Sequence, residues 1–297
     1  MLPILDRLKS PGVLVADGAM GTMLFERGLD MGQCPEKLNL DRPQMLTQIA
    51  RLYLEAGADI VQTNTFGGSP LKLAQYNLDF RTEEINVAAV RAARAAIGDR
   101  AYLSASCGPC GRLLKPYGDV EPEEVAEGFR RQMRALVAQG VDMICIETMT
   151  DLAEAVLAVK AARSVSANVP VAATMTFDPT PGGFFTMMGV SVEQAVAGLS
   201  EAGADIIGSN CGNGIENMVM IATEFARYTR LPLLIQSNAG LPELRDGAAV
   251  YSETPEFMAE QCMRLVDSGV RIIGGCCGTT PEHIAAIRRR VDNRTTG

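Results

Sequence analysis

The sequence lacks several features that mark common functional classes. It has one histidine and no tryptophan in 297 residues, which disfavours both histidine-rich metal sites and a Ser-His-Asp triad. No run of about 18 apolar residues occurs, so we expect no transmembrane helix and no membrane partner. The segment that follows Met1 has no basic stretch leading into an apolar one, so we expect no secretory signal and a cytoplasmic location.

Positive charge is also scarce in this chain. Lysine and arginine number 27 against 35 acidic residues, which gives a formal net charge of −8. Binding to nucleic acid needs a basic surface, so we expect no nucleic-acid partner. The 8 cysteines are too few for a disulfide scaffold of this length. In a reducing compartment, clustered cysteines indicate metal binding or catalysis instead.

Short β-branched runs recur along the chain with helix-like segments between them, and they predict eight strands. The eight runs are residues 13–16, 59–63, 101–105, 142–146, 171–175, 205–208, 233–236 and 270–273. We find no linker-like change of composition. Eight βα units without a break predict a single (β/α)8 TIM barrel, with residues 1–297 as one domain. The alternative, an open doubly wound sheet, lacks a G-x-G-x-x-G fingerprint in the first βα turn.

A repeated phrase supports this prediction. Residues 55–60 and 201–206 both read EAGADI, and residues 139–144 and 267–272 are weaker copies. This pattern is typical of a helix that ends at a glycine and is followed by a tight turn and a buried strand.

Function in a (β/α)8 barrel belongs at the C-terminal ends of the strands. Cys211 follows one predicted strand, and Cys276 and Cys277 follow another two positions away around the ring. Neighbouring side chains in a strand point to opposite faces, so the last two can share a site only if the chain leaves strand geometry there. We expect Gly274, Gly275 and Gly278 to give it that freedom.

Three thiolates suit zinc and leave a fourth tetrahedral position open, which is typical of a catalytic site. The spacing leaves two other interpretations open. The three cysteines could be small buried apolar residues, or the adjacent pair could form a disulfide.

Three motifs resemble a known family. Residues 208–212 (GSNCG) and 274–279 (GGCCGT) resemble the zinc signature of the homocysteine S-methyltransferase family. Residues 17–22 (DGAMGT) resemble the opening of the homocysteine-binding module of cobalamin-dependent methionine synthase. The resemblance extends in order over essentially the whole chain. It implies a (β/α)8 barrel, zinc held by Cys211, Cys276 and Cys277, and homocysteine or a related thiol as the fourth ligand.

The resemblance also implies substrate contacts. Asp17 and Glu147 match the acids that hold the ammonium group of the amino acid. The backbone at Gly18 and Ala19, with Asn210 nearby, matches positions around the substrate carboxylate or the metal. The implied reaction is methyl transfer to the thiol of homocysteine, which gives methionine.

The methyl donor is left open by the sequence. The chain has no Asp-x-His-x-x-Gly motif of a cobalamin module, so we expect methylcobalamin on a separate corrinoid protein to be the donor. S-methylmethionine, betaine or another donor or thiol is the alternative within the same chemistry. A non-catalytic accessory barrel that docks a corrinoid protein is the alternative from another class.

Three further features have competing interpretations. Cys107 and Cys110 spell the thioredoxin tetrapeptide, but the aromatic residue and the helix start that a redox motif needs are missing. His283 is expected to be a solvated residue in a first helical turn rather than a zinc ligand. Residues 178–189 follow the fifth strand and are expected to hang over the site, as a lid or a donor-docking surface.

Overall fold

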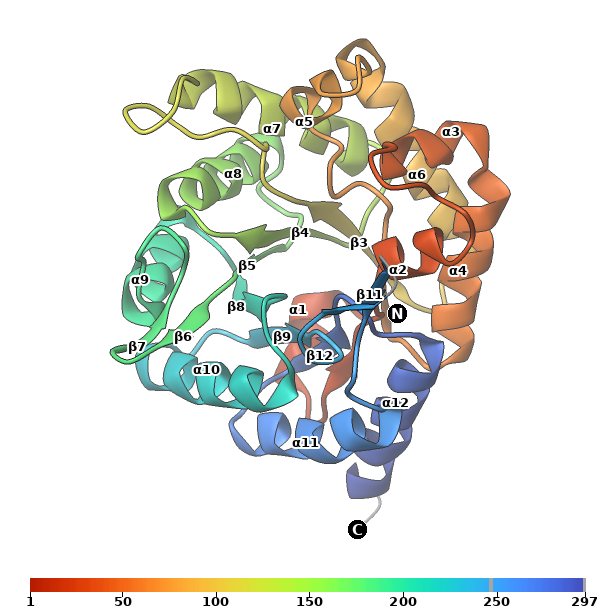
Figure 1. The fold of residues 1–297 in the computed structure, drawn as a ribbon, viewed down its shortest axis with the longest axis vertical. Coiled ribbons are helices and arrows are strands. Elements are labelled where there is room, and N and C mark those ends of the chain that lie inside the picture. Colours follow the sequence, from red (N-terminus) through yellow and green to blue (C-terminus); the bar gives the residue numbers. More distant parts are fainter. Residues whose placement is uncertain (246–247, 296–297) are drawn as a thin grey trace.

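Eight parallel strands form one sheet in the computed structural model, which describes residues 1–245 and 248–295. Their order around the sheet is β1-β12-β9-β8-β5-β4-β3-β2. The first and last strands meet through a bridge between Ala16 and Ile60, and Asp17 N–H donates to the Ile60 carbonyl at 2.9 Å. The sheet therefore closes on itself, and the predicted (β/α)8 barrel is confirmed (Figure 1).

Each barrel strand overlaps one of the predicted runs. The bounds are β1 (Leu14–Val15), β2 (Ile60–Gln62), β3 (Tyr102–Cys107), β4 (Met143–Met149), β5 (Val171–Met175), β8 (Ile206–Asn210), β9 (Leu233–Ser237) and β12 (Ile272–Gly275). Burial along these strands is nearly complete, as expected for a parallel sheet that is covered on both faces.

Eight helices form the outer ring (Figure 1): α4 (Pro43–Glu55), α6 (Thr82–Ile97), α7 (Pro122–Val137), α8 (Leu152–Val165), α9 (Val192–Ala202), α10 (Ile215–Tyr228), α11 (Pro255–Asp267) and α12 (Pro281–Thr295). Thr254 caps α11 by accepting from Phe257 N–H at 3.3 Å, as the sequence Thr-Pro-Glu predicts. The repeated EAGADI phrase behaves as predicted, since Gly57 and Gly203 follow helices with φ of 95° and 102°.

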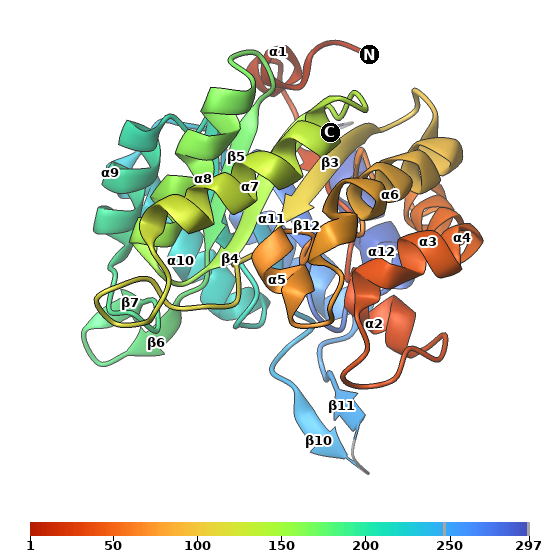
Figure 2. The same cartoon turned by 90° about the horizontal axis from the view of Figure 1, so that it is seen from above.

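The interior of the barrel changes from apolar to polar along its axis. Helix α1 (Ile4–Lys9) closes the end where the strands begin, and Ile4 and Leu8 pack there with Leu14, Tyr102 and Met143. Ser106 and Glu147 are buried polar side chains nearer the C-terminal ends of the strands. Figure 2 shows α1 at one end of the molecule and, at the other, the hairpins β6 (Asp178–Thr180) with β7 (Gly183–Phe185) and β10 (Glu243–Arg245) with β11 (Ala248–Val250).

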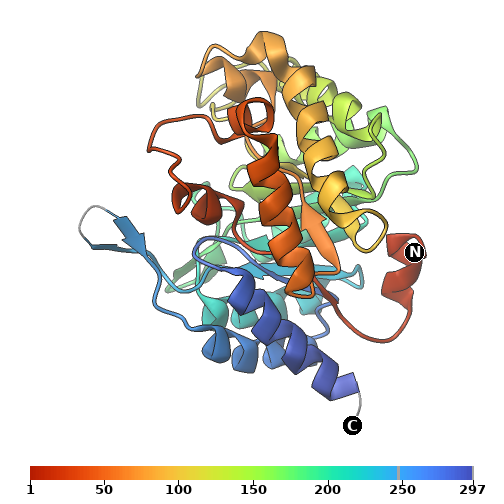
Figure 3. The ribbon, with the colours of Figure 1, turned by 90° about the vertical axis from the view of Figure 1, so that its right-hand side faces the viewer.

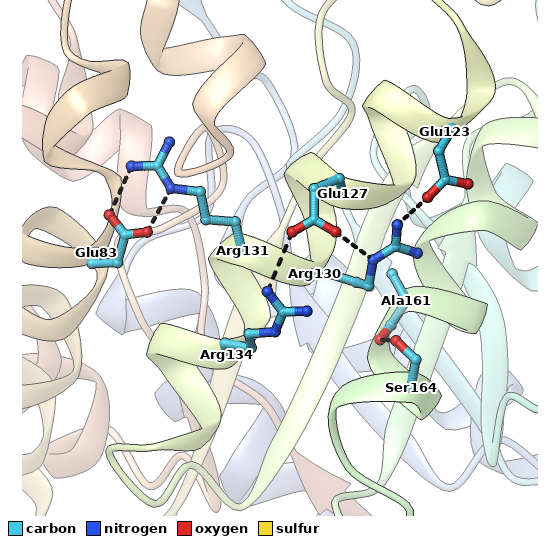
Figure 4. Close-up of polar contacts among 8 residues, drawn as sticks. All are labelled: Glu83, Glu123, Glu127, Arg130, Arg131, Arg134, Ala161 and Ser164. Atoms are coloured by element: carbon cyan, nitrogen blue, oxygen red, sulfur yellow. Dashed lines mark hydrogen bonds and ion pairs between the residues drawn. The ribbon is translucent and has the colours of Figure 1, made fainter.

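Ion pairs occupy the outer face of α7 (Figure 4). Glu127 pairs with Arg130 at 2.7 Å and with Arg134 at 3.2 Å, and Arg131 reaches Glu83 on α6. Exposed pairs of this kind contribute about 0–1 kcal/mol each. The barrel therefore depends mainly on the apolar layer between sheet and helices.

Smaller elements occupy the connections that follow the strands. They are α2 (Met20–Phe25), η1 (Pro35–Lys37), α3 (Leu38–Asp41), α5 (Pro70–Ala74), η2 (Asp79–Arg81) and the hairpins β6 (Asp178–Thr180) with β7 (Gly183–Phe185) and β10 (Glu243–Arg245) with β11 (Ala248–Val250). We expected residues 178–189 to hang over the site. Figure 1 instead shows the β6–β7 hairpin at the outer edge beside α9, away from the centre of the barrel. None of the helices in the described ranges is long and apolar enough to cross a membrane.

Candidate metal and substrate site

The three predicted cysteines meet at the mouth of the barrel. The Sγ atoms of Cys211, Cys276 and Cys277 all lie within 4.8 Å of one another, and those of Cys211 and Cys277 are 3.8 Å apart. Two sulfurs bound at about 2.3 Å to a tetrahedral zinc would be about 3.8 Å apart. The spacing and the sulfur donors therefore fit a single zinc ion. All three are free thiols here, so the adjacent pair does not form a disulfide.

The backbone places these thiols by leaving strand geometry. Strand β12 ends at Gly275, and Cys276 begins a tight turn in which Thr279 N–H donates to its carbonyl at 3.1 Å. Cys211 follows β8 with φ of 62°, a left-handed conformation that a non-glycine residue seldom adopts. Backbone strain of this kind is concentrated at active sites and ligand-binding sites, where the surrounding structure holds the residue in place.

We predicted that three glycines near the cysteine pair provide backbone freedom, and this holds for one of the three. Only Gly278, with φ of 80°, uses conformational freedom. Gly274 and Gly275 are needed for space, because a Cβ would lie 2.8 Å from Ala16 Cβ at the first and 2.2 Å from Thr279 Oγ1 at the second. The turn thus packs against the loop that follows β1.

The sulfur cluster has polar neighbours. Asn210 Nδ2 lies 3.9 Å from Cys276 Sγ, and the Tyr251 ring lies against Gly278, the residue after Cys277. A hydrogen bond with the neighbouring Cys211 thiol lowers the pKa of Cys277. Our sequence analysis missed Tyr251, which lies outside every motif.

Asp17 and Glu147 are buried near this cluster. Burial raises the pKa of Asp17 to about 8 and that of Glu147 to about 7. Glu147 accepts a hydrogen bond from Ser106, and its charge interacts with Cys277 and with Asp17. The Asp17 Oδ1 atom has no hydrogen-bond partner among the described residues, whereas Oδ2 accepts from Gln62 N–H at 2.8 Å. An unpartnered buried carboxylate oxygen is suited to a cationic ligand.

The remaining predicted contacts have fixed partners. Asn210 joins strands, because its Oδ1 accepts from Thr148 N–H and from Thr174 Oγ1, both at 2.7 Å. Ala19 N–H already donates to Thr279 Oγ1 at 3.1 Å. Gly18 leaves no room for a side chain, since a Cβ would lie 2.7 Å from the same hydroxyl.

Two other expectations have clear outcomes. Cys107 and Cys110 are buried free thiols, and burial raises the pKa of both, which disfavours the thiolate that a redox motif requires. The prediction of a solvated His283 is wrong, because the side chain is only 7% exposed. Its Nδ1 accepts from Thr280 N–H at 3.2 Å and its Nε2 donates to the Glu253 carbonyl at 3.0 Å, so neither nitrogen is directed at the thiols.

The fold and this cluster define a (β/α)8 barrel with three converging thiols at its catalytic end. Residues 14–291 match the family model described as Homocysteine S-methyltransferase. The chain therefore belongs to the homocysteine S-methyltransferase family.

Sequence relatives agree with this assignment. Methionine synthase of Mycobacterium tuberculosis (strain ATCC 25618 / H37Rv) is 33% identical over 98% of this chain and 25% of its own length. Methionine synthase of Mycobacterium leprae (strain TN) is 31% identical over 94% of this chain and 24% of its own length. The chain thus spans about a quarter of the length of these curated relatives.

Solved structures support the fold. The homocysteine methyltransferase MmuM from Escherichia coli superposes in its metallated form with a TM-score of 0.81 at 23% identity, over 97% of this chain and 99% of that one. Its oxidized form gives 0.80 at 22% identity, over 98% and 100%.

Proposed function

We propose that this protein transfers a methyl group to the thiol of homocysteine and gives methionine, with zinc held by Cys211, Cys276 and Cys277. The observation that carries the proposal is the meeting of these three thiols within 4.8 Å at the barrel mouth. The family, described as homocysteine S-methyltransferase, supports the reaction type. A bound metal is also supported by the homocysteine methyltransferase MmuM, a protein of the same fold that has been solved in a metallated form.

Bound zinc would offer its fourth ligand position to the substrate sulfur and would keep that sulfur as a thiolate at neutral pH. A free thiol with a pKa near 8.5 is only a few per cent thiolate at pH 7, so this effect is worth about 2 kcal/mol. The rest of the barrier must be lowered by alignment of sulfur, methyl group and donor. The sulfur–methyl bond forms while the donor–methyl bond breaks, and the donor keeps the electron pair.

The buried acids of this chain would orient the substrate. We infer that Asp17 and Glu147 bind its ammonium group, because the free Oδ1 of Asp17 offers an unused acceptor. The backbone at Gly18 and Ala19 would lie beside the substrate carboxylate or the metal, with Asn210 nearby. Asn210 would position the thiol cluster rather than bind the substrate directly. Its amide is already hydrogen-bonded to Thr148 and Thr174 and lies close to Cys276.

We propose methylcobalamin carried by a corrinoid protein or domain as the methyl donor. Loops that follow the strands carry many exposed large apolar side chains: Phe25, Met31, Phe66, Leu113, Tyr117, Met187, Met188, Leu241, Leu244 and Val250. Exposed apolar surface around a site is typical of a protein-docking face. A small donor such as S-methylmethionine or betaine would not need it, and these donors remain the alternative.

Removal of the cysteines tests the reaction and the metal together. We expect Cys211→Ser, Cys276→Ser and Cys277→Ser to lose bound zinc and methyl transfer together, by more than about a hundredfold in rate. Zinc would be measured by mass spectrometry of the purified protein, and methionine after incubation with homocysteine and methylcobalamin, S-methylmethionine or betaine. Cys262→Ser, a buried cysteine of α11, is the control.

Full activity in a metal-free triple variant would contradict the proposal. Zinc binding without product from any donor would favour the accessory barrel. The cytoplasmic location and the assignment of residues 1–297 to one domain stay predictions from the sequence.

A further inference from the structure

Two segments at the mouth of the barrel would hold opposite ends of the substrate. The loop after β1 (residues 17–22) begins with the acid Asp17, and the cysteine turn after β12 (residues 276–279) begins with the thiol pair. Gly275 N–H donates to the Asp17 carbonyl at 2.9 Å, directly before the turn. The distance between the acid and the thiols therefore depends on how these two segments pack against each other.

Thr279 joins the two segments through one hydroxyl group. Its side chain is fully buried, and its Oγ1 accepts from Ala19 N–H at 3.1 Å and donates to the Cys276 carbonyl at 2.7 Å. A Cβ at Gly18 would lie 2.7 Å from this oxygen, and one at Gly275 would lie 2.2 Å from it. The hydroxyl thus occupies a space that both segments leave open for it.

Tyr53 fixes the same contact from the outer ring of helices. It belongs to α4, which Figure 3 shows in orange beside α12, the dark blue helix that follows Thr279. The buried Tyr53 hydroxyl donates to the Ala19 carbonyl at 3.0 Å and lies 3.3 Å from the Thr279 carbonyl oxygen. Gly278 N–H adds a bond to Thr22 Oγ1 at 3.0 Å. The loop is therefore fastened to the turn at several points.

The turn itself does not depend on the Thr279 hydroxyl. Thr279 N–H also donates to the Cys276 carbonyl, at 3.1 Å, and this backbone bond remains when the side chain is changed. Loss of the hydroxyl would therefore loosen the loop of Asp17 while the turn that carries the thiols keeps its shape.

We propose that Thr279 is a specificity-determining positioning residue, whose hydroxyl fixes the distance between the acids that would hold the substrate ammonium and the thiols that would hold the metal. This inference rests on the proposed function. Homocysteine has one methylene group more than the amino acid cysteine between its ammonium-bearing carbon and its sulfur. A fixed distance selects one of these lengths, because a displacement of about 1 Å is enough to lose a productive alignment.

The test compares variants that keep or remove the hydroxyl. Thr279→Val keeps the branched shape without the hydroxyl, whereas Thr279→Ser keeps the hydroxyl and should restore the wild-type behaviour. Tyr53→Phe removes the second connection and leaves Thr279 intact. Thr82→Val is the matched control, because Thr82 is also fully buried and its Oγ1 donates to the carbonyl three residues earlier, that of Asp79, at 2.7 Å.

Three quantities would be measured for each variant. Calorimetry on the zinc-loaded protein gives the affinities for homocysteine and for the amino acid cysteine. Competition with a chromophoric chelator gives the zinc affinity. Thermal unfolding shows that each variant is folded, and Tyr53→Phe decides the question if Thr279→Val is not.

We expect the wild type to prefer homocysteine to cysteine at least about tenfold, the scale of discrimination that one methylene group provides. Thr279→Val and Tyr53→Phe should lower this preference at least about threefold, because the loop of Asp17 gains freedom. Thr279→Ser and Thr82→Val should keep the preference. Zinc affinity should stay within about threefold of the wild type in every variant, since no metal ligand is changed.

A preference within about twofold of the wild type in both Thr279→Val and Tyr53→Phe would overturn the inference. An equal loss in Thr279→Ser would overturn it too, because that variant keeps the hydroxyl. If the wild type binds homocysteine but transfers no methyl group from any donor, the proposed function fails, while the comparison of affinities still decides the role of Thr279.

Discussion

Asp17 and Glu147 are carboxylic acids whose surroundings oppose their ionisation. Burial is the main cause, and it raises the pKa of Asp17 to about 8 and that of Glu147 to about 7. The native protein therefore holds protons that the unfolded chain has released from about pH 4 upward. The contribution of these two groups to the stability of the ligand-free protein falls as the pH rises from about 4 to 8, because they bind fewer protons in the unfolded state in that range.

We expect Asp17→Asn to stabilise the ligand-free protein at pH 8.5 by at least about 1 kcal/mol, since one pKa unit corresponds to 1.36 kcal/mol. The same change should raise the KM for homocysteine, because the ammonium group loses a charged partner. Urea unfolding at pH 5 and 8.5 and steady-state kinetics would check this, with Glu147→Gln as the parallel variant. No gain in stability at pH 8.5 would show that Asp17 is ionised without cost.

The affinity for homocysteine should depend on the ionisation of Asp17 and Glu147 too, but it should rise with pH where their contribution to stability falls. A cationic ammonium favours ionised acids, so binding of homocysteine should release protons near pH 7 and strengthen from pH 6 to 8. Calorimetry in buffers of different ionisation enthalpy measures the number of protons released.

Strand β8 positions Cys211 because it lies unusually close to β9. A Cβ at Gly208 would come 1.9 Å from the Leu234 carbonyl oxygen, so only glycine is accommodated at this pairing. Cys211 N–H donates to the Gln236 carbonyl at 3.1 Å and continues the same pairing into the metal loop. The distance between Cys211 and Cys277 therefore depends on this strand pair.

We expect Gly208→Ala to lower the free energy of unfolding by about 3 kcal/mol and to weaken zinc binding, because the strands must separate. Ser191→Ala is the matched control, since it removes the capping box of α9 at a cost of about 1 kcal/mol. Its zinc affinity should match that of the wild type. Chemical denaturation and chelator competition separate the two variants, and equal zinc affinities would contradict this account of β8.

At the scale of the whole molecule, exposed apolar side chains gather on the loops around the mouth. Met187 is 81% exposed and Tyr117 80%, and a cavity of about 430 Å³ lies between the loop of Tyr117, the start of α8 and Met188. A group of large exposed apolar side chains indicates an interaction surface, whereas single scattered ones do not. This distribution is what we expect where a donor-carrying protein approaches the thiols.

A variant with Leu113→Ser, Tyr117→Ser and Met187→Ser should lower kcat/KM at least about tenfold with a protein-borne corrinoid donor. It should leave the rate with free methylcobalamin unchanged, because none of these residues belongs to the thiol cluster. Met220→Ser together with Tyr228→Ser, exposed on α10, is the control pair. Equal losses with both donors would contradict the docking face.

Much of the architecture could be predicted from the sequence because its signals are local. The strand runs and the glycines that end helices each depend on neighbouring residues, and both were found where predicted. The cysteine cluster was also predictable, since the closed ring brings strand ends together whatever the intervening chain. The same local reasoning fails for His283, whose burial depends on Glu253, 30 positions away.

The sequence by itself determined the barrel through its strand period and the meeting of the three thiols through their places at the strand ends, and the family resemblance singled out the two acids. Only the tertiary structure decided that Asp17 Oδ1 has no hydrogen-bond partner among the described residues, that Gly274 and Gly275 are needed for space, and that the Tyr251 ring lies on Gly278. These features depend on how the loops that follow different strands pack against one another at the mouth of the barrel. That packing is set by contacts between distant residues, and no local pattern of side chains records it.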